Sequence, residues 1–315
     1  MDVMKKLKIA TLGTPADYPL SLVPLIIRHL GYEIQWSSSL EADLLIYGPF
    51  YKKKKDYPYL PKPLRPVAKS IQKKMNQRAS LPVTLFQTGE NIRHDFISAQ
   101  FSLSFDLTQD PHHYRFPYWM EMVDWSHEGV VGNINPRFGQ LLSLDHMMQP
   151  LGAKFLDRNH RAAFITSHLQ EPRKTLYTAI SKVLDIDGFG PYFNSTIKNH
   201  LQSGFVKSQI LQNFSFNLCP ENGLYPGYYT EKIPEAFLSG CLPLAWTDTN
   251  IKIDFNPLAM INLQPMMWNN FEGLKELLHD KKQLQGFAEQ PLIIEKPSIQ
   301  SLKEFIQKMI RDSLS

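Results

Sequence analysis

The chain has 315 residues, of which 43% are hydrophobic and 20% are charged. This composition is typical of a globular protein and excludes an intrinsically disordered one, and the length gives room for two domains that each bury a core. The net charge is +4 and no recognition motif accompanies it, so the sequence gives no indication of nucleic-acid binding.

The apolar runs are short. None approaches the roughly 18 residues of a membrane-spanning helix, and the first residues lead into an apolar strand without the hydrophobic segment of a signal peptide. We therefore expect a cytoplasmic protein. Basic residues gather at 52–55 and 69–78. A solvated surface is the favoured interpretation, and peripheral contact with anionic lipids on the inner face of the membrane is the alternative.

The first half of the sequence alternates strand-like and helix-like segments. Strand patterns cover residues 7–12, 32–36, 42–47, 83–87 and 101–105, and helical patterns cover residues 20–30 and 67–77. Strands separated by helices predict a parallel sheet with crossover connections. From residue 114 the pattern loosens, so we expect a first α/β domain over residues 1–150.

Regular alternation returns in the second half. Strand patterns cover residues 162–166, 214–218, 242–246 and 260–263, residues 186–192 form a strand or turn, and helical patterns cover residues 173–184, 197–202, 271–279 and 302–314. This predicts a second α/β domain over residues 151–315. The last helix is amphipathic, which favours packing back onto the body, with an interfacial membrane helix as the alternative.

The loop between the strands at 214–218 and 242–246 contains an unusual concentration of chemical groups. In open α/β sheets, ligands bind where strand ends meet helix starts. The side chains at that point are Glu221, Asn222, Tyr228, Glu231 and Lys232. The loop is therefore a candidate ligand site, although Asn and Gly are also ordinary turn residues.

The motif Phe216-x-Leu-x-x-Glu-Asn222, followed by Tyr228-x-Thr-Glu-Lys232, resembles the signature of the family 10 glycosyltransferases, which are α-1,3/1,4-fucosyltransferases. Residues 88–91, 101–106 and 114–117 resemble the N-terminal half of bacterial members, and residues 164–167, Arg173 and 188–194 resemble the blocks that follow. The resemblance covers roughly residues 85–250. It implies the GT-B fold, in which two Rossmann-like domains face a central cleft. The first domain would bind the acceptor and carry the base, and the second would bind GDP-fucose.

The resemblance also implies roles for single residues. Arg173 and Lys232 match positions that bind the donor pyrophosphate, where a guanidinium fork and a lysine neutralise the leaving group. Glu231 matches the acid that accepts hydrogen bonds from the ribose hydroxyls. Tyr228 and Asn222 match donor-site positions, and Glu221 supports them. Glu90 matches the general base, and we expect partial desolvation after a buried strand to raise its basicity.

Two prolines depart from the family pattern. Pro220 stands where bacterial relatives usually carry an aromatic residue. Pro234 disfavours a helical conformation for the residue before it, so we expect the helix of the signature to begin near residue 234.

Metal and cysteine chemistry are not expected. Asp185-x-Asp187 has the form of a metal-binding motif, but the family resemblance assigns charge neutralisation to Arg and Lys, so we expect no metal and no cofactor. The scattered histidines lack zinc-site spacing. Buried free thiols are the favoured interpretation of Cys219 and Cys241, and a disulfide is the alternative.

The leading functional hypothesis is an inverting fucosyltransferase. It would transfer L-fucose from GDP-β-L-fucose to a hydroxyl of an N-acetylglucosamine-type acceptor, in α-1,3 or α-1,4 linkage, during glycan or lipopolysaccharide O-antigen synthesis. Its partners would be the sugar nucleotide and a glycan acceptor. The alternatives are the same scaffold with another sugar nucleotide, or a non-catalytic glycan- or nucleotide-binding module. A positioned base argues against the binding module.

Overall fold

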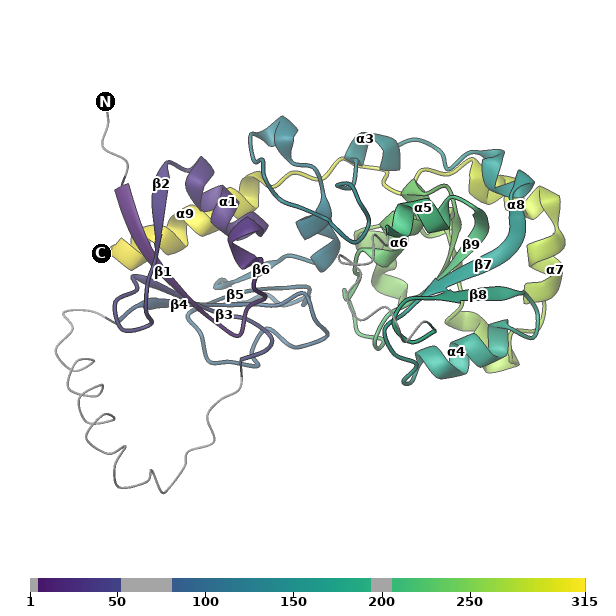
Figure 1. The fold of residues 1–315 in the computed structure, drawn as a ribbon, viewed down its shortest axis with the longest axis horizontal. Coiled ribbons are helices and arrows are strands. Elements are labelled where there is room, and N and C mark those ends of the chain that lie inside the picture. The colour runs from purple at the N-terminus through teal and green to yellow at the C-terminus, as the bar shows by residue number, and fades with distance from the viewer. Residues whose placement is uncertain (1–4, 52–80, 194–205, 315) are drawn as a thin grey trace, which may run out of the picture.

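The computed structural model describes residues 5–51, 81–193 and 206–314. Two parallel β-sheets lie in two halves that are arranged along the long axis of the molecule (Figure 1). The helices expected at 67–77 and 197–202 and the basic clusters at 52–55 and 69–78 lie outside the described residues. The predicted α/β class with two parallel sheets is confirmed.

The first sheet has the strand order β2-β1-β3-β4-β5-β6, and every neighbouring pair is parallel. Its strands are β1 (Lys5–Leu12), β2 (Tyr32–Trp36), β3 (Leu44–Tyr47), β4 (Val83–Gln87), β5 (Phe101–Ser104) and β6 (His113–Arg115). Helix α1 (Leu22–His29) covers one face with its apolar side. The strand predictions for this half are confirmed, except that β6 was missed because it has only three residues.

The second sheet has the order β11-β10-β9-β7-β8 and is also parallel. Its strands are β7 (Asn159–Ile165), β8 (Ile186–Phe189), β9 (Phe214–Pro220), β10 (Leu242–Trp246) and β11 (Ile261–Asn262). Its helices are α4 (Arg173–Ile180), α5 (Lys207–Leu211), α6 (Lys232–Leu238), α7 (Leu274–His279) and α8 (Lys281–Ala288). Strand β9 is buried along its whole length, including the polar residues Ser215 and Asn217.

Short elements connect and flank the sheets. They are helix α3 (Leu144–Met147) and the 3₁₀ helices Tyr18–Leu20, Tyr118–Met122, Ser126–Glu128, Ala153–Asp157, Thr249–Ile253, Pro257–Ala259 and Pro265–Asn269. Helix α6 begins at Lys232, two residues before Pro234. A proline in the first turn of a helix is tolerated because the N–H groups there have no partner within the helix.

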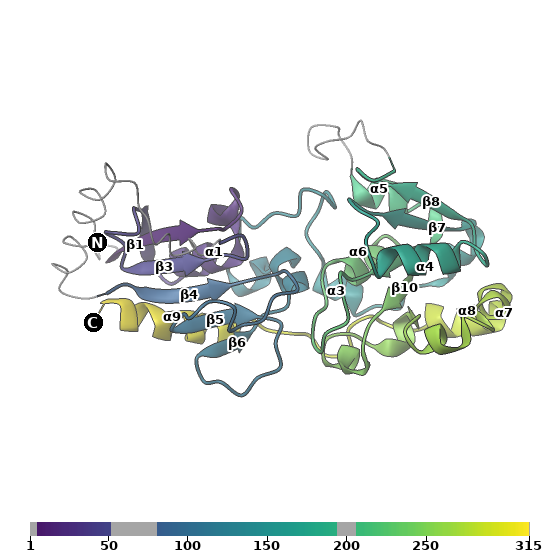
Figure 2. The ribbon, with the colours of Figure 1, turned by 90° about the horizontal axis from the view of Figure 1, so that it is seen from below.

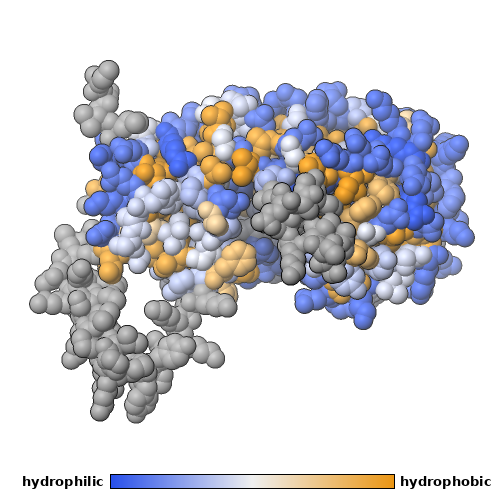
Figure 3. All heavy atoms as spheres, in the orientation of Figure 1, coloured by the Kyte–Doolittle hydropathy of each residue, from blue (hydrophilic) through white to orange (hydrophobic). Residues whose placement is uncertain are grey.

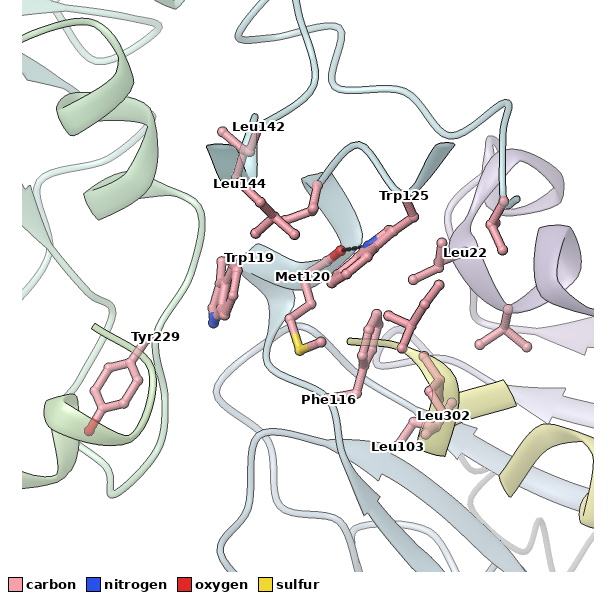
Figure 4. Close-up of a cluster of buried hydrophobic side chains, with 14 of the residues drawn as sticks. Leu22, Leu103, Phe116, Trp119, Met120, Trp125, Leu142, Leu144, Tyr229 and Leu302 are labelled. Carbon is pink, nitrogen blue, oxygen red and sulfur yellow. Dashed lines mark hydrogen bonds between the residues drawn. The ribbon is translucent and has the colours of Figure 1, made fainter. Parts of the chain in front are cut away.

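The C-terminal helix α9 (Gln300–Leu314) returns to the first half, where it packs against α1 and β4 (Figure 2). Leu302 lies beside Leu103 and Phe116 in the buried cluster drawn in Figure 4. The ring of Phe305 meets the edge of Phe101 at a centroid distance of 5.7 Å. Packing of this helix onto the body is thus confirmed. The division at residue 150 stays a prediction, and it takes no account of α9.

Two further expectations concern side chains of the second half. Cys219 and Cys241 are buried free thiols, as the favoured interpretation held. Arg161 pairs with both acids of the Asp-x-Asp motif, donating to Asp185 at 2.9 Å and, by two further hydrogen bonds, to Asp187. The two carboxylates therefore serve as partners of an arginine at the edge strand β8.

The surface in Figure 3 is mainly hydrophilic over the C-terminal half, with apolar residues in small groups. Across residues 5–51, 81–193 and 206–314, no helix is long and apolar enough to cross a membrane.

We predict that the packing of α9 contributes strongly to the stability of the first half. Ile306 is fully buried, so Ile306→Ala should lower the free energy of unfolding by about 2–5 kcal/mol. Gln307→Ala, on the exposed side of the same helix, should change it by less than about 0.5 kcal/mol. Urea denaturation followed by circular dichroism measures both, and equal effects of the two variants would contradict the packing role.

Candidate functional site

A cleft of about 580 Å³ lies between the two halves, at the carboxyl ends of strands from both sheets. The segments after β1, β3 and β4 supply one wall, and those after β7 and β9 supply the other. Of the predicted site residues, Glu90, Arg173, Asn222, Tyr228, Glu231 and Lys232 line the cleft. Glu221 lies behind them and is 1% exposed.

The loop after β9, residues 221–231, is held in shape by the buried carboxylate of Glu221. Its Oε1 accepts hydrogen bonds from the Thr230 backbone N–H at 2.9 Å and the Thr230 hydroxyl at 2.8 Å. Its Oε2 accepts from Lys232 Nζ at 2.8 Å. We call residues 221–231 the signature loop. The first residue of the loop thus bonds to Thr230 near its other end and to Lys232 just after it. Glu221 in this way fixes Lys232 at the start of α6, facing the cleft.

Arg173 is the first residue of α4 and is only 7% exposed. Its guanidinium donates to Asn222 Oδ1 at 2.5 Å, to Thr166 Oγ1 at 3.2 Å and to His168 Nε2 at 2.9 Å. Burial lowers the pKa of Arg173, although Glu221 and the other acids around it act in the opposite direction. Burial and the charge of Arg173 also lower the pKa of His168, which favours the neutral ring that can accept this hydrogen bond.

Glu231 belongs to a buried network of charges. Lys207 on α5 lies 3.3 Å from Glu231 and 2.6 Å from Glu235, and the Asn135 amide donates to Glu235 at 3.1 Å. Burial by itself would raise the pKa of Glu231, but Lys232 and Lys207 outweigh it and lower this pKa to about 2. Glu231 is therefore ionised throughout the physiological range.

Tyr228 is 3% exposed and packs on Phe105 of the first half with a ring centroid distance of 4.8 Å. Burial, reinforced by the charges of Glu221 and Glu90, raises its pKa. The hydroxyl therefore stays protonated and can donate a hydrogen bond into the cleft.

Glu90 stands on the opposite wall, in the segment after β4. Its backbone N–H donates to the Thr88 hydroxyl at 3.0 Å. A Cβ at the preceding Gly89 would approach the ring of Tyr118 to 2.3 Å, so the close contact with that ring requires glycine. The Glu90 side chain is exposed to the cleft. The structure thus places Glu90 at the exposed surface of the cleft, and the partial desolvation that we expected after a buried strand is not seen.

Sequence reasoning missed several polar groups of the site, namely Thr166, His168, Lys207, Glu235 and Asn135. Thr166 lies within the block 164–167, His168 directly follows it and Glu235 follows the signature motif, which were usable signals. Lys207 and Asn135 lie outside these blocks. Pro220, the departure from the family pattern, lines the cleft. In the part of the chain that the structure describes, no three His, Cys, Asp or Glu side chains are grouped so that they could hold a metal ion.

Glu121 is a buried carboxyl group in the first wall of the cleft. Its Oε1 accepts the backbone N–H of Leu22 at 2.5 Å at the start of α1, whereas its Oε2 has no hydrogen-bond partner. Burial raises the pKa of Glu121 to about 7, against smaller opposing effects of Leu22 and Ser21. The amide oxygen of Asn217, at the second wall, also lacks a partner.

The comparisons with known proteins agree with this geometry. Residues 155–287 match the family model described as glycosyltransferase family 10 (fucosyltransferase), C-terminal. The α-(1,3)-fucosyltransferase FucT of Helicobacter pylori is 27% identical over 233 residues, which cover 66% of this chain and 47% of that protein. The chain thus spans about half the length of this curated relative.

Crystal structures of similar fold point the same way. One of an α1,3-fucosyltransferase aligns with a TM-score of 0.65 at 23% identity and covers 98% of this chain and 90% of the other. The crystal structure of an α1,3-fucosyltransferase with GDP-fucose aligns with a TM-score of 0.64 at 21% identity. This alignment covers 100% of this chain and 92% of the other. The two-sheet fold with its central cleft defines a GT-B glycosyltransferase fold. Within that class, residues 155–287 are similar to the C-terminal part of glycosyltransferase family 10.

We predict that Glu121 makes the stability depend on pH. Its pKa rises from 4.5 in the unfolded chain to about 7 in the folded one, so the folded state binds more protons between these values and loses stability as the pH rises through them. Relative to Glu121→Gln, the wild type should lose roughly 3 kcal/mol between about pH 4 and pH 8. Denaturant titrations across this range measure the difference, and parallel curves would refute the assignment.

Proposed function

We propose that the protein is an inverting fucosyltransferase. It transfers L-fucose from GDP-β-L-fucose to a hydroxyl of an N-acetylglucosamine-type acceptor and forms an α-1,3 or α-1,4 linkage. One observation carries the proposal: two cations and an ionised acid, Arg173, Lys232 and Glu231, line the same cleft as Glu90 on the facing wall. The GDP-fucose of the similar crystal structure supports the choice of donor.

The second wall suits a nucleoside diphosphate. Arg173 and Lys232 bring positive charge to the place where the diphosphate would lie, and this charge matters most when the bond to the sugar breaks and the phosphate oxygen takes up the electron pair. Glu231 offers two ionised acceptor oxygens to the ribose hydroxyls. Tyr228 can donate to a phosphate or sugar oxygen.

The first wall provides the base. In the proposed step, Glu90 takes the proton of the acceptor hydroxyl while the hydroxyl oxygen attacks the anomeric carbon and GDP departs from the opposite side. The single displacement inverts β to α. The structure leaves Glu90 exposed, so we infer that bound acceptor and donor supply the desolvation that raises its basicity.

The hydrogen-bond partners of the two cations are consistent with this assignment. Arg173 bonds to the neutral groups of Asn222 and His168, which give way to phosphate oxygens at little electrostatic cost. Lys232 keeps Glu221 as its counter-ion, which holds the ammonium in place before the donor arrives.

The domain roles follow from the same proposal. Residues 1–150 would bind the acceptor and supply the base, and residues 151–315 would bind the donor, apart from α9. A scaffold with another sugar nucleotide and a non-catalytic nucleotide-binding module are the competing functions, and the next two experiments distinguish them.

We predict that GDP raises the melting temperature more than UDP or CMP does. A ligand that binds only the folded state stabilises it by mass action, so the ranking of the shifts reports the ranking of affinities. Differential scanning fluorimetry with each nucleotide at the same concentration measures this. Equal shifts would refute the guanosine donor, and a larger shift with UDP would favour the alternative scaffold function.

Two substitutions should separate binding from chemistry. Glu90→Gln keeps the size of the side chain but cannot accept the proton, so transfer should be lost while the affinity for GDP stays unchanged. Lys232→Ala should weaken GDP binding and also lower kcat by about 10²–10³.

Calorimetry with GDP and a transfer assay on the same preparations measure both. Retained transfer in Glu90→Gln would place the base elsewhere. A binding module would give GDP binding without transfer even in the wild type.

A further inference from the structure

The segment that carries Glu90 meets the signature loop directly, beside the cleft. A Cβ at Gly223 would come within 2.9 Å of the Asn91 amide, and a Cβ at Gly227 within 2.6 Å of the Phe105 carbonyl oxygen. Asn91 follows Glu90, and Gly223 follows Asn222. The two halves of the molecule are therefore in close contact at the two segments that carry the site residues.

Arg93 is the residue that bridges these segments. Its guanidinium lies 3.2 Å from the ring centroid of Tyr225 in the signature loop and 4.5 Å from that of Phe105 in the first half. A planar cation between two rings is held by both stacking and charge, and only arginine has this geometry. Arg93 itself lies outside the cleft.

The same guanidinium is tied to the Glu90 segment by hydrogen bonds. It donates to Asn91 Oδ1, one residue after Glu90, and lies 3.4 Å from Asp106 Oδ1. The other oxygen of Asp106 accepts the backbone N–H of His94 at 2.8 Å. Asp106 is 4% exposed and also bonds to the Ser104 hydroxyl, so this anchor is rigid.

On the side of the signature loop, the contact continues towards the donor site. Phe105 packs against Tyr225 at a centroid distance of 5.9 Å and against Tyr228 at 4.8 Å. Tyr228 lines the cleft beside Arg173 and Asn222. A displacement of the signature loop would therefore move Tyr225 against Arg93 and shift the backbone next to Glu90.

We propose that Arg93 is a positioning residue, which sets the place of Glu90 relative to the donor by stacking on Tyr225 while it bonds to the Glu90 segment. The inference rests on the proposed function. In this proposal, Arg93 connects the signature loop to the segment that carries the base, and Arg93 itself contacts neither substrate.

The test uses Arg93→Lys, which keeps the charge but loses the planar stack and the fork, and Tyr225→Ala, which removes the ring. A small misplacement of a catalytic group costs up to about 10²-fold in rate, so both variants should lower kcat for transfer by about 10–10². The dissociation constant for GDP should stay within about twofold of wild type, because Arg93 is absent from the cleft. Tyr225→Phe keeps the ring and should retain activity.

Two comparisons distinguish positioning from a general loss of structure. The double variant Arg93→Lys/Tyr225→Ala should be no slower than the slower single variant, since both remove the same link. Arg115→Lys is the matched control, because Arg115 donates to Gly227 O of the signature loop at 3.2 Å and to Asp254 at 2.7 Å, and its hydrogen bonds within the described residues do not reach the segment that carries Glu90. It should lower the melting temperature without changing kcat.

A further readout follows Glu90 itself. If Arg93 positions the base, Arg93→Lys should lower the rate of transfer relative to the rate at which water hydrolyses the donor. Loss of Arg173 or Lys232 should instead lower both rates together. Unchanged kcat in Arg93→Lys, additive losses in the double variant, or an equal loss in Arg115→Lys would each overturn the positioning role. Failure of the proposed function would give a different result, because the wild type would then transfer no fucose. The same variants would then be compared with the sugar nucleotide that the wild type uses.

Discussion

The ion pair between Glu221 and Lys232 is the interaction on which the cleft depends. A carboxylate that is 1% exposed is costly unless both its oxygens are hydrogen-bonded, and Thr230 and Lys232 supply these bonds. This requirement brings the end of β9 and the start of α6 together and fixes the loop between them. The positions of Asn222, Tyr228 and Glu231 follow from that closure.

The charges of the site are balanced before any ligand arrives. Lys207 pairs with Glu231 and Glu235, and Lys232 pairs with Glu221, so each buried lysine has an acid within hydrogen-bonding distance. Arg173 is the exception, since its direct partners are neutral. Arg173 could therefore bind an anion without displacing a counter-ion.

Much of the fold could be predicted from local pattern. Strands β2, β4 and β10 begin and end at the predicted residues because short apolar runs between turn signals leave little freedom. Strand β6 and helices α5 and α8 were missed, since they are short or only weakly apolar. Helix α6 begins at Lys232, whereas we expected it to begin near residue 234. The prediction did not allow for the fact that proline is tolerated in the first turn of a helix.

The sequence by itself determined the α/β class, the family resemblance and the segments that carry Glu90, Arg173 and the signature loop, because periodicity and motif spacing are local properties. Only the tertiary structure decided that Glu90 is exposed, that Lys207 and Asn135 join the charge network, and that Arg93 stacks on Tyr225. Each of these contacts joins residues far apart in the chain. Asn135 and Arg93 meet residues of the second half only where the two halves pack, and Lys207 meets Glu231 through the packing of α5 beside α6. No local pattern in the sequence specifies this packing.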